Sequence, residues 1–195
     1  MDFKKKDIVI TSALRSAIGT FGGALRFMKG HDLGSIVVKE IMKKSKLKAD
    51  DVDEVIMGQV LTAASGQNTA RQAALQAGLS NEKTSYVINQ VCGSGLRSVV
   101  AGYQSLILGD SNIIIAGGQE SMTNAPHTIN FRNGKKLNEK NLVDTIIKDG
   151  LWDAFNGYHM GVTAENVAKK WDISRKDQDE FAVSSQNKAE KAEKE

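Results

Sequence analysis

Cys92 is the single cysteine of a 195-residue chain, and it lies in the stretch INQVCGSGLRSVV at residues 88–100. A β-like run precedes it, and Gly93 and Gly95 open a helical pattern directly after it. A thiolate is a strong nucleophile, so a cysteine in this setting is suited to nucleophilic catalysis. The competing interpretation is a small buried core residue, which is how an intracellular cysteine commonly packs.

The predicted surroundings of Cys92 favour a nucleophile over a buried core residue. A residue between the end of a strand and the start of a helix lies at the carboxyl edge of an α/β sheet, where ligands usually bind. Gly93 and Gly95 have no side chains that would obstruct a substrate, and the N–H groups of a first helical turn have no partner within the helix. Such groups favour a nearby anion by about 1 to 2 kcal/mol at best, which does not ionise a thiol fully at neutral pH.

A catalytic Cys92 therefore needs a basic partner. His31, His127 and His159 are the only imidazoles of the chain, and their positions in the sequence place none of them beside Cys92. A different interpretation treats the same glycines as a dinucleotide-binding loop. The run from Gly93 begins the pattern G-x-G-x-x-G, but Ser98 stands where the third glycine belongs, so this interpretation is disfavoured.

The composition narrows the class of protein. Hydrophobic residues make up 41% of the chain, enough to bury the core of one domain or one and a half. A mild net charge of +3 with few aromatic residues gives no sign of nucleic-acid binding. Scattered histidines and one cysteine disfavour a metal site or disulfide framework. No run approaches the roughly 20 apolar residues of a membrane span, so we expect a cytoplasmic protein with no membrane partner.

The elements that position Cys92 follow an alternating order. Apolar β-branched runs alternate with helical patterns, which predicts βαβ units and a mainly parallel sheet. Strands are expected over residues 7–13, 52–60, 85–91 and 112–116. Helices are expected after a cap at Asp32, from about Asn68 to Gly78, and from about Gly93 to Leu108.

The third predicted helix has an apolar stripe that we expect to pack in the core. Its members are Leu96, Val99, Val100, Tyr103 and Ile107. After Gly118 the alternation of apolar strand and helix patterns stops, and the chain becomes more polar. Further along, Ser174 with Asp177 forms a capping signal for a last helix. That helix runs into NKAEKAEKE with no stop signal, which is compatible with a frayed terminus or with a truncated longer protein.

Five segments of the chain resemble one known family, the thiolases. They are NQVCGSGLRSV (89–99), SALRSAIGTFGGAL (12–25), GQVLTAASGQNTARQAALQAGL (58–79), GGQESMTNAP (117–126) and GYHMGVTAENVA (157–168). The first resembles the nucleophile signature of the family, and the last is most similar to its short-chain bacterial acetyl-CoA acetyltransferases. Ala17, Thr69 and Thr123 depart from common family residues without affecting the chemistry.

The resemblance implies a thiolase-like α/β fold with helices on both faces of a mainly parallel sheet. Residues 1–121 would form the N-terminal βαβαβαβ core that carries the nucleophile, and residues 122–195 part of a loop domain that covers coenzyme A. A C-terminal half of similar fold would be absent. In the family that half holds the base that activates the cysteine and a second cysteine, so we expect this chain alone to be catalytically poor.

The resemblance also implies a two-step acyl transfer. Cys92 would accept an acetyl group from acetyl-CoA, and a second acetyl-CoA would attack the thioester to give acetoacetyl-CoA. The residues implied are Cys92 as nucleophile, Gly93, Ser94 and Gly95 as the oxyanion and nucleophile loop, and Leu151, His159 and Met160 around the substrate. Coenzyme A thioesters would be substrates, with no separate cofactor and no metal. The full-length family members would be homodimers or tetramers of fatty acid metabolism.

Two alternatives remain open. The chain could be a non-catalytic acyl-CoA-binding module or a fragment that pairs with another chain. It could also be a related condensing enzyme such as a ketoacyl synthase, which HMGVTAENVA disfavours because that segment resembles the CoA-using branch.

Overall fold

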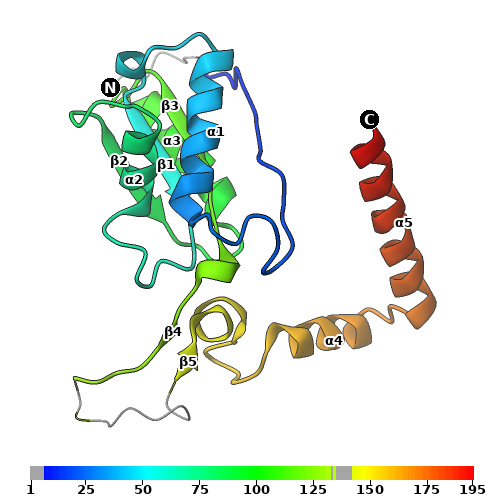
Figure 1. Ribbon diagram of the computed structural model, residues 1–195. Coiled ribbons are helices and arrows are strands. Elements are labelled where there is room, and N and C mark those ends of the chain that lie inside the picture. The colour runs from blue at the N-terminus through cyan, green and yellow to red at the C-terminus, as the bar shows by residue number, and fades with distance from the viewer. Residues whose placement is uncertain (1–6, 133, 135–141) are drawn as a thin grey trace. The chain divides into compact units, whose positions relative to one another are not determined.

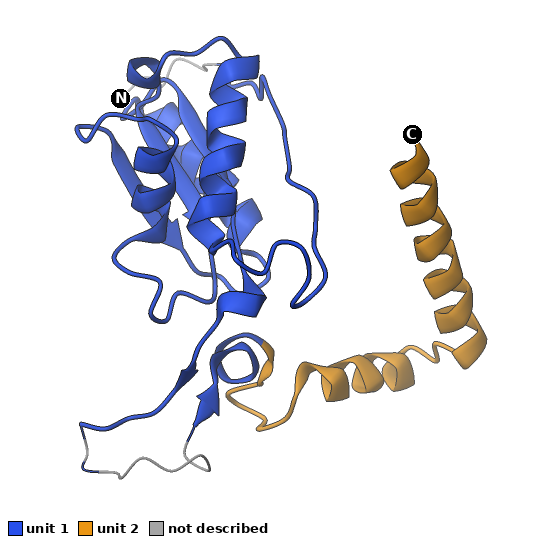
Figure 2. Ribbon diagram, viewed as in Figure 1, with its two compact units in different colours: residues 1–150 blue, residues 151–195 orange. Residues whose placement is uncertain are grey.

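The computed structural model describes residues 7–132, 134 and 142–195. The chain forms two compact units, residues 1–150 and 151–195 (Figure 2). The first contains the sheet and extends beyond the predicted division after residue 121. That division refers to the domains of a whole thiolase and stays a prediction.

Three parallel strands form the main sheet of the first unit. They are β1 (Glu54–Gly58), β2 (Thr84–Ile88) and β3 (Ile114–Gly118), in the order β2–β1–β3 (Figure 1). Gly58 pairs in register with Ile88 and Gly118, so all three strands end at the same carboxyl edge. Three of the four predicted strands are thus confirmed.

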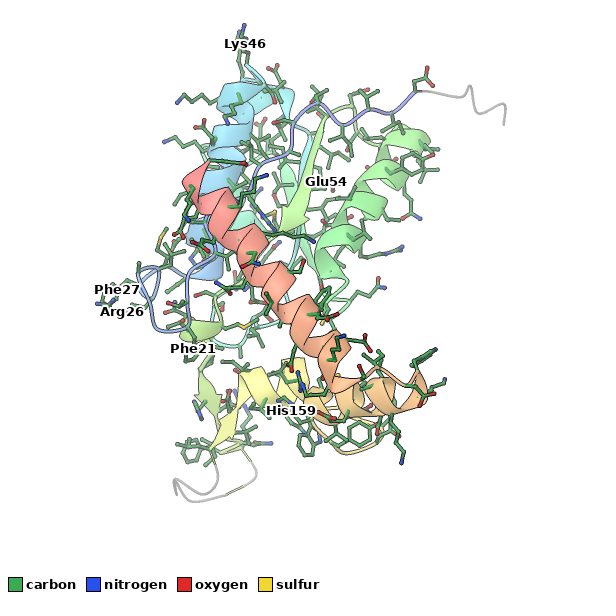
Figure 3. All side chains as sticks on the ribbon, turned by 90° about the vertical axis from the view of Figure 1, so that its right-hand side faces the viewer. Phe21, Arg26, Phe27, Lys46, Glu54 and His159 are labelled. Atoms are coloured by element: carbon green, nitrogen blue, oxygen red, sulfur yellow. The ribbon has the colours of Figure 1, made fainter. Side chains whose placement is uncertain are left out.

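Helices cover both faces of this sheet, as predicted. The helices α1 (Gly30–Lys44) and α2 (Thr69–Gln76) pack together on one side, and α3 (Ser94–Leu108) packs on β1 and β3 from the other (Figures 1 and 3). The main core lies between the sheet and the first two helices. It contains Val38 and Met42 from α1, Val55 and Met57 from β1, and Ala70 and Ala74 from α2.

The helix boundaries follow local capping chemistry. Asn68 caps α2 by accepting a hydrogen bond from the Arg71 N–H at 3.1 Å, as its predicted start requires. The prediction that Asp32 caps the first helix is wrong, because α1 begins at Gly30. Asp32 lies within the first turn, where its carboxylate accepts from the Lys29 N–H at 2.9 Å.

The predicted strand at residues 7–13 is not formed, which corrects the expected βαβαβαβ order. Val9 and Ile10 are exposed, and the segment pairs with no described strand. A cavity of about 290 Å³ is lined by residues 8–12 together with residues 113–116 of the β3 region. Alternating apolar residues form a strand only when they pair with a neighbouring strand edge, and residues 7–13 make no such pairing with a described strand.

The expected burial of the α3 stripe is also wrong. Leu96 is 73% and Tyr103 52% exposed, and the remaining stripe residues are more than a third exposed. The helix instead packs on the sheet through Ser94, Ser98 and Gly102, which recur every four residues. Small side chains permit a close approach of helix to strands, so the apolar stripe is not buried against the sheet. Two of its members, Val99 and Tyr103, line the cavity beside residues 8–12 and 113–116.

The remaining elements are short strands and helices. The first unit also contains the 3-10 turns Ala49–Asp51 and Met122–Asn124, and the antiparallel pair β4 (His127–Thr128) and β5 (Val143–Asp144). A π-helix spans Ile146–Leu151, and the second unit contains α4 (Met160–Lys170) and α5 (Arg175–Lys194). Ser174 caps α5 with Asp177 as predicted. No helix of the described residues is long and apolar enough to cross a membrane.

Candidate active site

Cys92 lies in the turn that connects β2 to α3. The strand ends at Ile88 and the helix begins after its cap residue Gly93, so the cysteine is at the carboxyl edge of the sheet. Its side chain is a free, exposed thiol. Cys92 is therefore accessible to a substrate and is not a buried core residue.

The backbone of this turn is strained at Val91. Its φ angle is 47°, in the left-handed region, which β-branched residues rarely adopt. The Asn89 side-chain oxygen accepts from the Val91 N–H at 2.9 Å. The hydroxyl of Ser94 accepts from the Gln90 N–H at 2.8 Å and donates to the Val91 carbonyl at 2.6 Å. Side chains on both sides of the turn thus fix its conformation.

Glycines at the strand ends allow the first turn of α3 to lie directly on the sheet. A Cβ atom at Gly58 would overlap the carbonyl carbon of Ser94 and would lie 2.5 Å from the amide nitrogen of Gly95. A Cβ at Gly118 would lie 3.4 Å from the Cα of Gly95. The requirement for Gly58 was not evident from the sequence, because it arises from a helix distant in the chain.

The three residues predicted to form an oxyanion loop differ in the availability of their N–H groups. The Gly93 N–H donates to the Gln90 carbonyl at 3.0 Å, and the Ser94 N–H donates to the Val91 carbonyl at 3.1 Å. The Gly95 N–H makes no hydrogen bond to any described residue. Of the three, Gly95 has the amide that is free to hold a developing oxyanion, and the role itself stays a prediction.

A buried polar cluster lies at the same sheet edge, after β1 and β3. The Glu120 carboxylate accepts from the N–H groups of Val60 and Leu61 at 2.9 and 3.2 Å, which fixes the chain after β1. The Gln59 side-chain oxygen accepts from Gln119 at 2.9 Å and from the Thr69 hydroxyl at 2.5 Å. Sequence analysis missed this cluster, because its members come from separate segments and form no motif.

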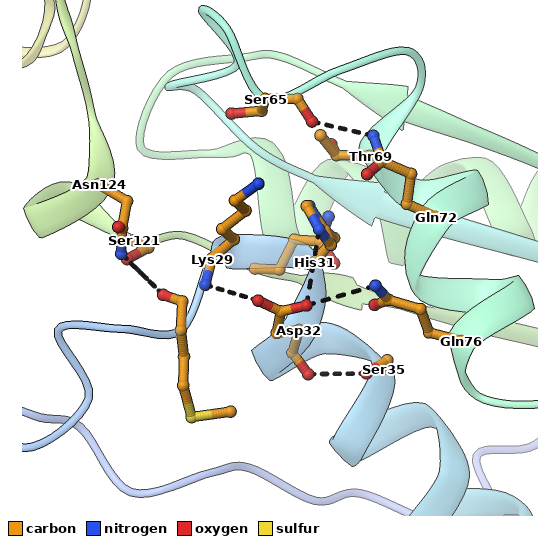
Figure 4. A network of polar contacts seen from close by, with 12 residues as sticks. Lys29, His31, Asp32, Ser35, Ser65, Thr69, Gln72, Gln76, Ser121 and Asn124 are labelled. Carbon is orange, nitrogen blue, oxygen red and sulfur yellow. Dashed lines mark hydrogen bonds and ion pairs between the residues drawn. The ribbon is translucent and has the colours of Figure 1, made fainter.

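The two histidines of the first unit, His31 and His127, have ionic partners other than Cys92. His31 is buried at the start of α1, where Asp32 lies 3.6 Å from its Nε2 and also accepts from Gln76 at 3.3 Å (Figure 4). His127 lies 3.9 Å from Asp144 in the β4 and β5 pair. Within the first unit, no described hydrogen bond or ion pair joins His31 or His127 to the Cys92 turn, so neither is placed as a base for this thiol.

The second unit contains the residues predicted around the substrate. Leu151 begins the unit, and His159 caps α4, with its Nδ1 accepting from the Gly161 N–H at 3.0 Å (Figure 3). An antiparallel bridge between Trp152 and His159 brings Leu151 close in the fold to His159 and Met160. These three residues thus form one cluster, whereas Cys92 belongs to the first unit.

Asp153 organises the loop that joins the two sides of this cluster. Its carboxylate accepts from the Asn156 side chain at 2.9 Å and from the N–H groups of Asn156 and Phe155 at 2.8 Å. The Asn156 side chain, followed by these two N–H groups, lowers the pKa of Asp153 below its usual range. The loop is therefore held by an ionised carboxylate at neutral pH.

A parallel sheet covered on both faces, with an exposed cysteine at the junction of strand and helix, defines an α/β protein with a candidate nucleophile at its carboxyl edge. Residues 8–195 match the family model described as thiolase, N-terminal domain. The chain belongs to the thiolase family.

Proteins of known identity support this assignment. The chain is 55% identical over 187 residues to an acetyl-CoA acetyltransferase of Rhizobium meliloti, covering 96% of this chain and 48% of the relative. It is 51% identical to the cytosolic acetyl-CoA acetyltransferase of Rattus norvegicus, with 96% and 47% covered. The crystal structure of the Bacillus anthracis acetyl-CoA acetyltransferase matches with a TM-score of 0.90 and 38% identity, covering 95% of this chain and 47% of that one. The chain thus spans about half the length of these relatives.

Proposed function

We propose that this chain provides the acyl-accepting nucleophile of an acetyl-CoA acetyltransferase. The single observation that carries the proposal is the exposed Cys92 at the strand–helix junction of a thiolase-family sheet. The thiolate sulfur of Cys92 attacks the carbonyl carbon of acetyl-CoA, and the bond between that carbon and the sulfur of coenzyme A breaks. Coenzyme A leaves as a thiolate and takes up a proton, so Cys92 carries the acetyl group as a thioester.

The second half-reaction needs groups beyond those that contact Cys92. A second acetyl-CoA must lose a proton from its methyl group before its carbon can attack the thioester and release free Cys92 with acetoacetyl-CoA. Within the first unit, neither His31 nor His127 makes a described hydrogen bond or ion pair with the Cys92 turn. Because the chain spans about half of its relatives, we assign this deprotonation to residues outside it.

The remaining site residues follow from the same proposal. The Gly95 N–H, at the start of α3, stabilises the oxyanion that forms at the acetyl carbonyl. Leu151, His159 and Met160 bind the coenzyme A thioester. Because the Nδ1 atom of His159 accepts from the Gly161 N–H, its Nε2 atom is the one left to face the thioester. No further cofactor takes part.

Assembly and location are part of the proposal. The whole protein acts as a homo-oligomer in the cytoplasm, in fatty acid metabolism. The exposed apolar stripe of α3 supports association with further protein surface, and a relative named as cytosolic supports the location.

A burst of coenzyme A release tests the acylation step. Incubating the chain with acetyl-CoA should release about one coenzyme A per chain and then stop, because the acetyl-enzyme has no means of turning over. Chromatography of the free coenzyme A measures the burst. Cys92→Ser should abolish it, and binding of acetyl-CoA without any release would favour a non-catalytic acyl-CoA-binding module.

Thiolysis of acetoacetyl-CoA tests whether the second half-reaction lies outside the chain. We expect no substantial turnover by the isolated chain, measured as loss of acetoacetyl-CoA in the presence of coenzyme A. Sustained turnover would show that the chain holds its own base and would contradict this part of the proposal.

A further inference from the structure

We propose that Ser94 is a positioning residue for Cys92. Its hydroxyl holds the strained peptide groups on the amino-terminal side of the cysteine, and this contact presents the thiol at the sheet edge. The inference rests on the proposed role of Cys92 as a nucleophile. It concerns the side chain of Ser94, whose N–H group already donates to the Val91 carbonyl at 3.1 Å.

The strain at Val91 needs compensation from its surroundings. A non-glycine residue with positive φ persists only where neighbouring contacts enforce it. Val91 has a φ of 47° and is 48% exposed, so burial of its own side chain does not explain the conformation. The Asn89 side chain provides one compensating hydrogen bond, and the Ser94 hydroxyl provides the other two.

The Ser94 hydroxyl has the one donor and the acceptor capacity that the two peptide groups of the turn require. It accepts one hydrogen bond, from the Gln90 N–H, and donates its single proton to the Val91 carbonyl. That carbonyl belongs to the peptide bond between Val91 and Cys92, so its direction sets the direction in which the chain enters Cys92. Replacement by alanine leaves the Gln90 N–H without its partner and leaves the Val91 carbonyl with the Ser94 N–H alone.

Ser94 itself is held in a fixed position by its surroundings. Ser94 is only 4% exposed, and its backbone lies against Gly58 so closely that no Cβ fits between them. The hydroxyl is therefore fixed by α3 and β1, and the turn is fixed by the hydroxyl.

Ser98 is a matched control on the same helix. It lies one turn after Ser94, is fully buried, and its hydroxyl is 2.7 Å from the carbonyl oxygens of Gly95 and Gly117. It joins α3 to β3, and its one contact with the nucleophile loop is the Gly95 carbonyl, which follows Cys92 and is not part of the strained turn before it. Alanine at Ser94 or Ser98 removes the same atom from the same helix, so a general loss of stability affects both variants.

The test measures the rate constant for alkylation of Cys92 by iodoacetamide in the 195-residue chain. Ser94→Ala should slow alkylation by about three- to tenfold, because the thiol loses its alignment with the start of α3. Ser98→Ala should remain within about twofold of the parent, since its contacts do not reach the turn. Val91→Gly added to Ser94→Ala should restore the rate to within about twofold, because glycine adopts positive φ without strain.

Two results would overturn the proposal. One is an equal loss of rate in Ser94→Ala and Ser98→Ala, and the other is a failure of Val91→Gly to restore the rate. If Ser94→Ala does not fold, hydrogen exchange in the parent chain tests whether the Ser94 hydroxyl holds the Gln90 N–H. The Gln90 N–H should then exchange at least about tenfold more slowly than an unbonded surface amide, and exchange at the unprotected rate contradicts the proposal.

Alkylation does not depend on acetyl transfer. If no variant or parent is acetylated by acetyl-CoA while the order of alkylation rates holds, the proposed function fails and the positioning role of Ser94 stands. If acetylation occurs but the alkylation rates do not follow the expected order, only the positioning role fails.

Discussion

Asp53 shows how one side chain joins two strands. Its carboxylate accepts from the N–H groups of Asn112 at 2.7 Å and Ile113 at 3.1 Å, which connects the start of β1 to the start of β3. These hydrogen bonds, first that of Asn112, lower the pKa of Asp53 below its ordinary value of 3.8, and Lys83 adds to the effect. The stabilisation is therefore present above pH 3.8 and is lost as the pH falls through the lower pKa of the folded state.

We expect Asp53→Asn to lower the free energy of unfolding at pH 7 by about 1 kcal/mol or less, since the carboxylate is partly exposed and solvent screens it. The variant should also lose less stability than the parent on acidification below pH 3.8. Urea unfolding at several pH values measures both effects. Asp110→Asn, which removes an exposed carboxylate with no described hydrogen bond, is the control, and equal acid sensitivity of parent and Asp53→Asn would contradict the account.

At the residue scale, sequence reasoning located Cys92 because a cysteine between a strand and a glycine-rich helix start is visible as a local pattern. The conformation of Val91 and the hydroxyl contacts of Ser94 were not predictable in this way. They depend on a backbone angle and on the closeness of α3 to β1, neither of which has a residue-type signature. The buried contact of Glu120 with Val60 and Leu61 was missed because it joins two loops distant in the sequence.

The packing of α3 on the sheet depends on Gly58. We expect Gly58→Ala to lower the free energy of unfolding by about 2 to 3 kcal/mol, because the new Cβ atom overlaps the backbone of Ser94. Gly117→Ala is the control, since a Cβ at Gly117 meets no atom within 4 Å. Urea unfolding of both variants measures the difference, and equal stabilities would contradict the close approach of α3 to β1.

The opposite face of α3 exposes its apolar stripe. We expect the chain to self-associate as its concentration rises, with a mean mass above 21.1 kDa by light scattering. Tyr103→Lys should shift the mass toward 21.1 kDa, because it places a charge within the stripe. Gln104→Lys adds the same charge at a neighbouring exposed position and should have less effect. A parent that stays at 21.1 kDa at all concentrations would show that the stripe does not drive association.

At the element scale, three strands and three helices followed from hydrophobic patterns and capping residues. Two of the wrong predictions, the strand at residues 7–13 and the burial of the α3 stripe, have one cause. Residues 7–13 have the alternation of a strand, and the α3 stripe has the spacing of a buried helix face, but a pattern does not specify whether a partner surface is present. In this structure neither segment has that partner, so both remain exposed.

At the scale of the whole molecule, the candidate site residues are divided between the two units of the chain. The first unit holds Cys92 on a sheet of the thiolase family, and the second holds the cluster of Leu151, His159 and Met160. Neither histidine of the first unit makes a described hydrogen bond or ion pair with the Cys92 turn, and the chain spans about half of its relatives. Under the proposed function, formation of the acetyl-enzyme is the step assigned to this chain.

Mass spectrometry of the chain after incubation with acetyl-CoA tests this claim most directly. The account predicts a mass increase of one acetyl group, located on the peptide that contains Cys92 and absent from Cys92→Ser. Acetylation that persists in Cys92→Ser, or an unmodified Cys92 in a chain that binds acetyl-CoA, would contradict it.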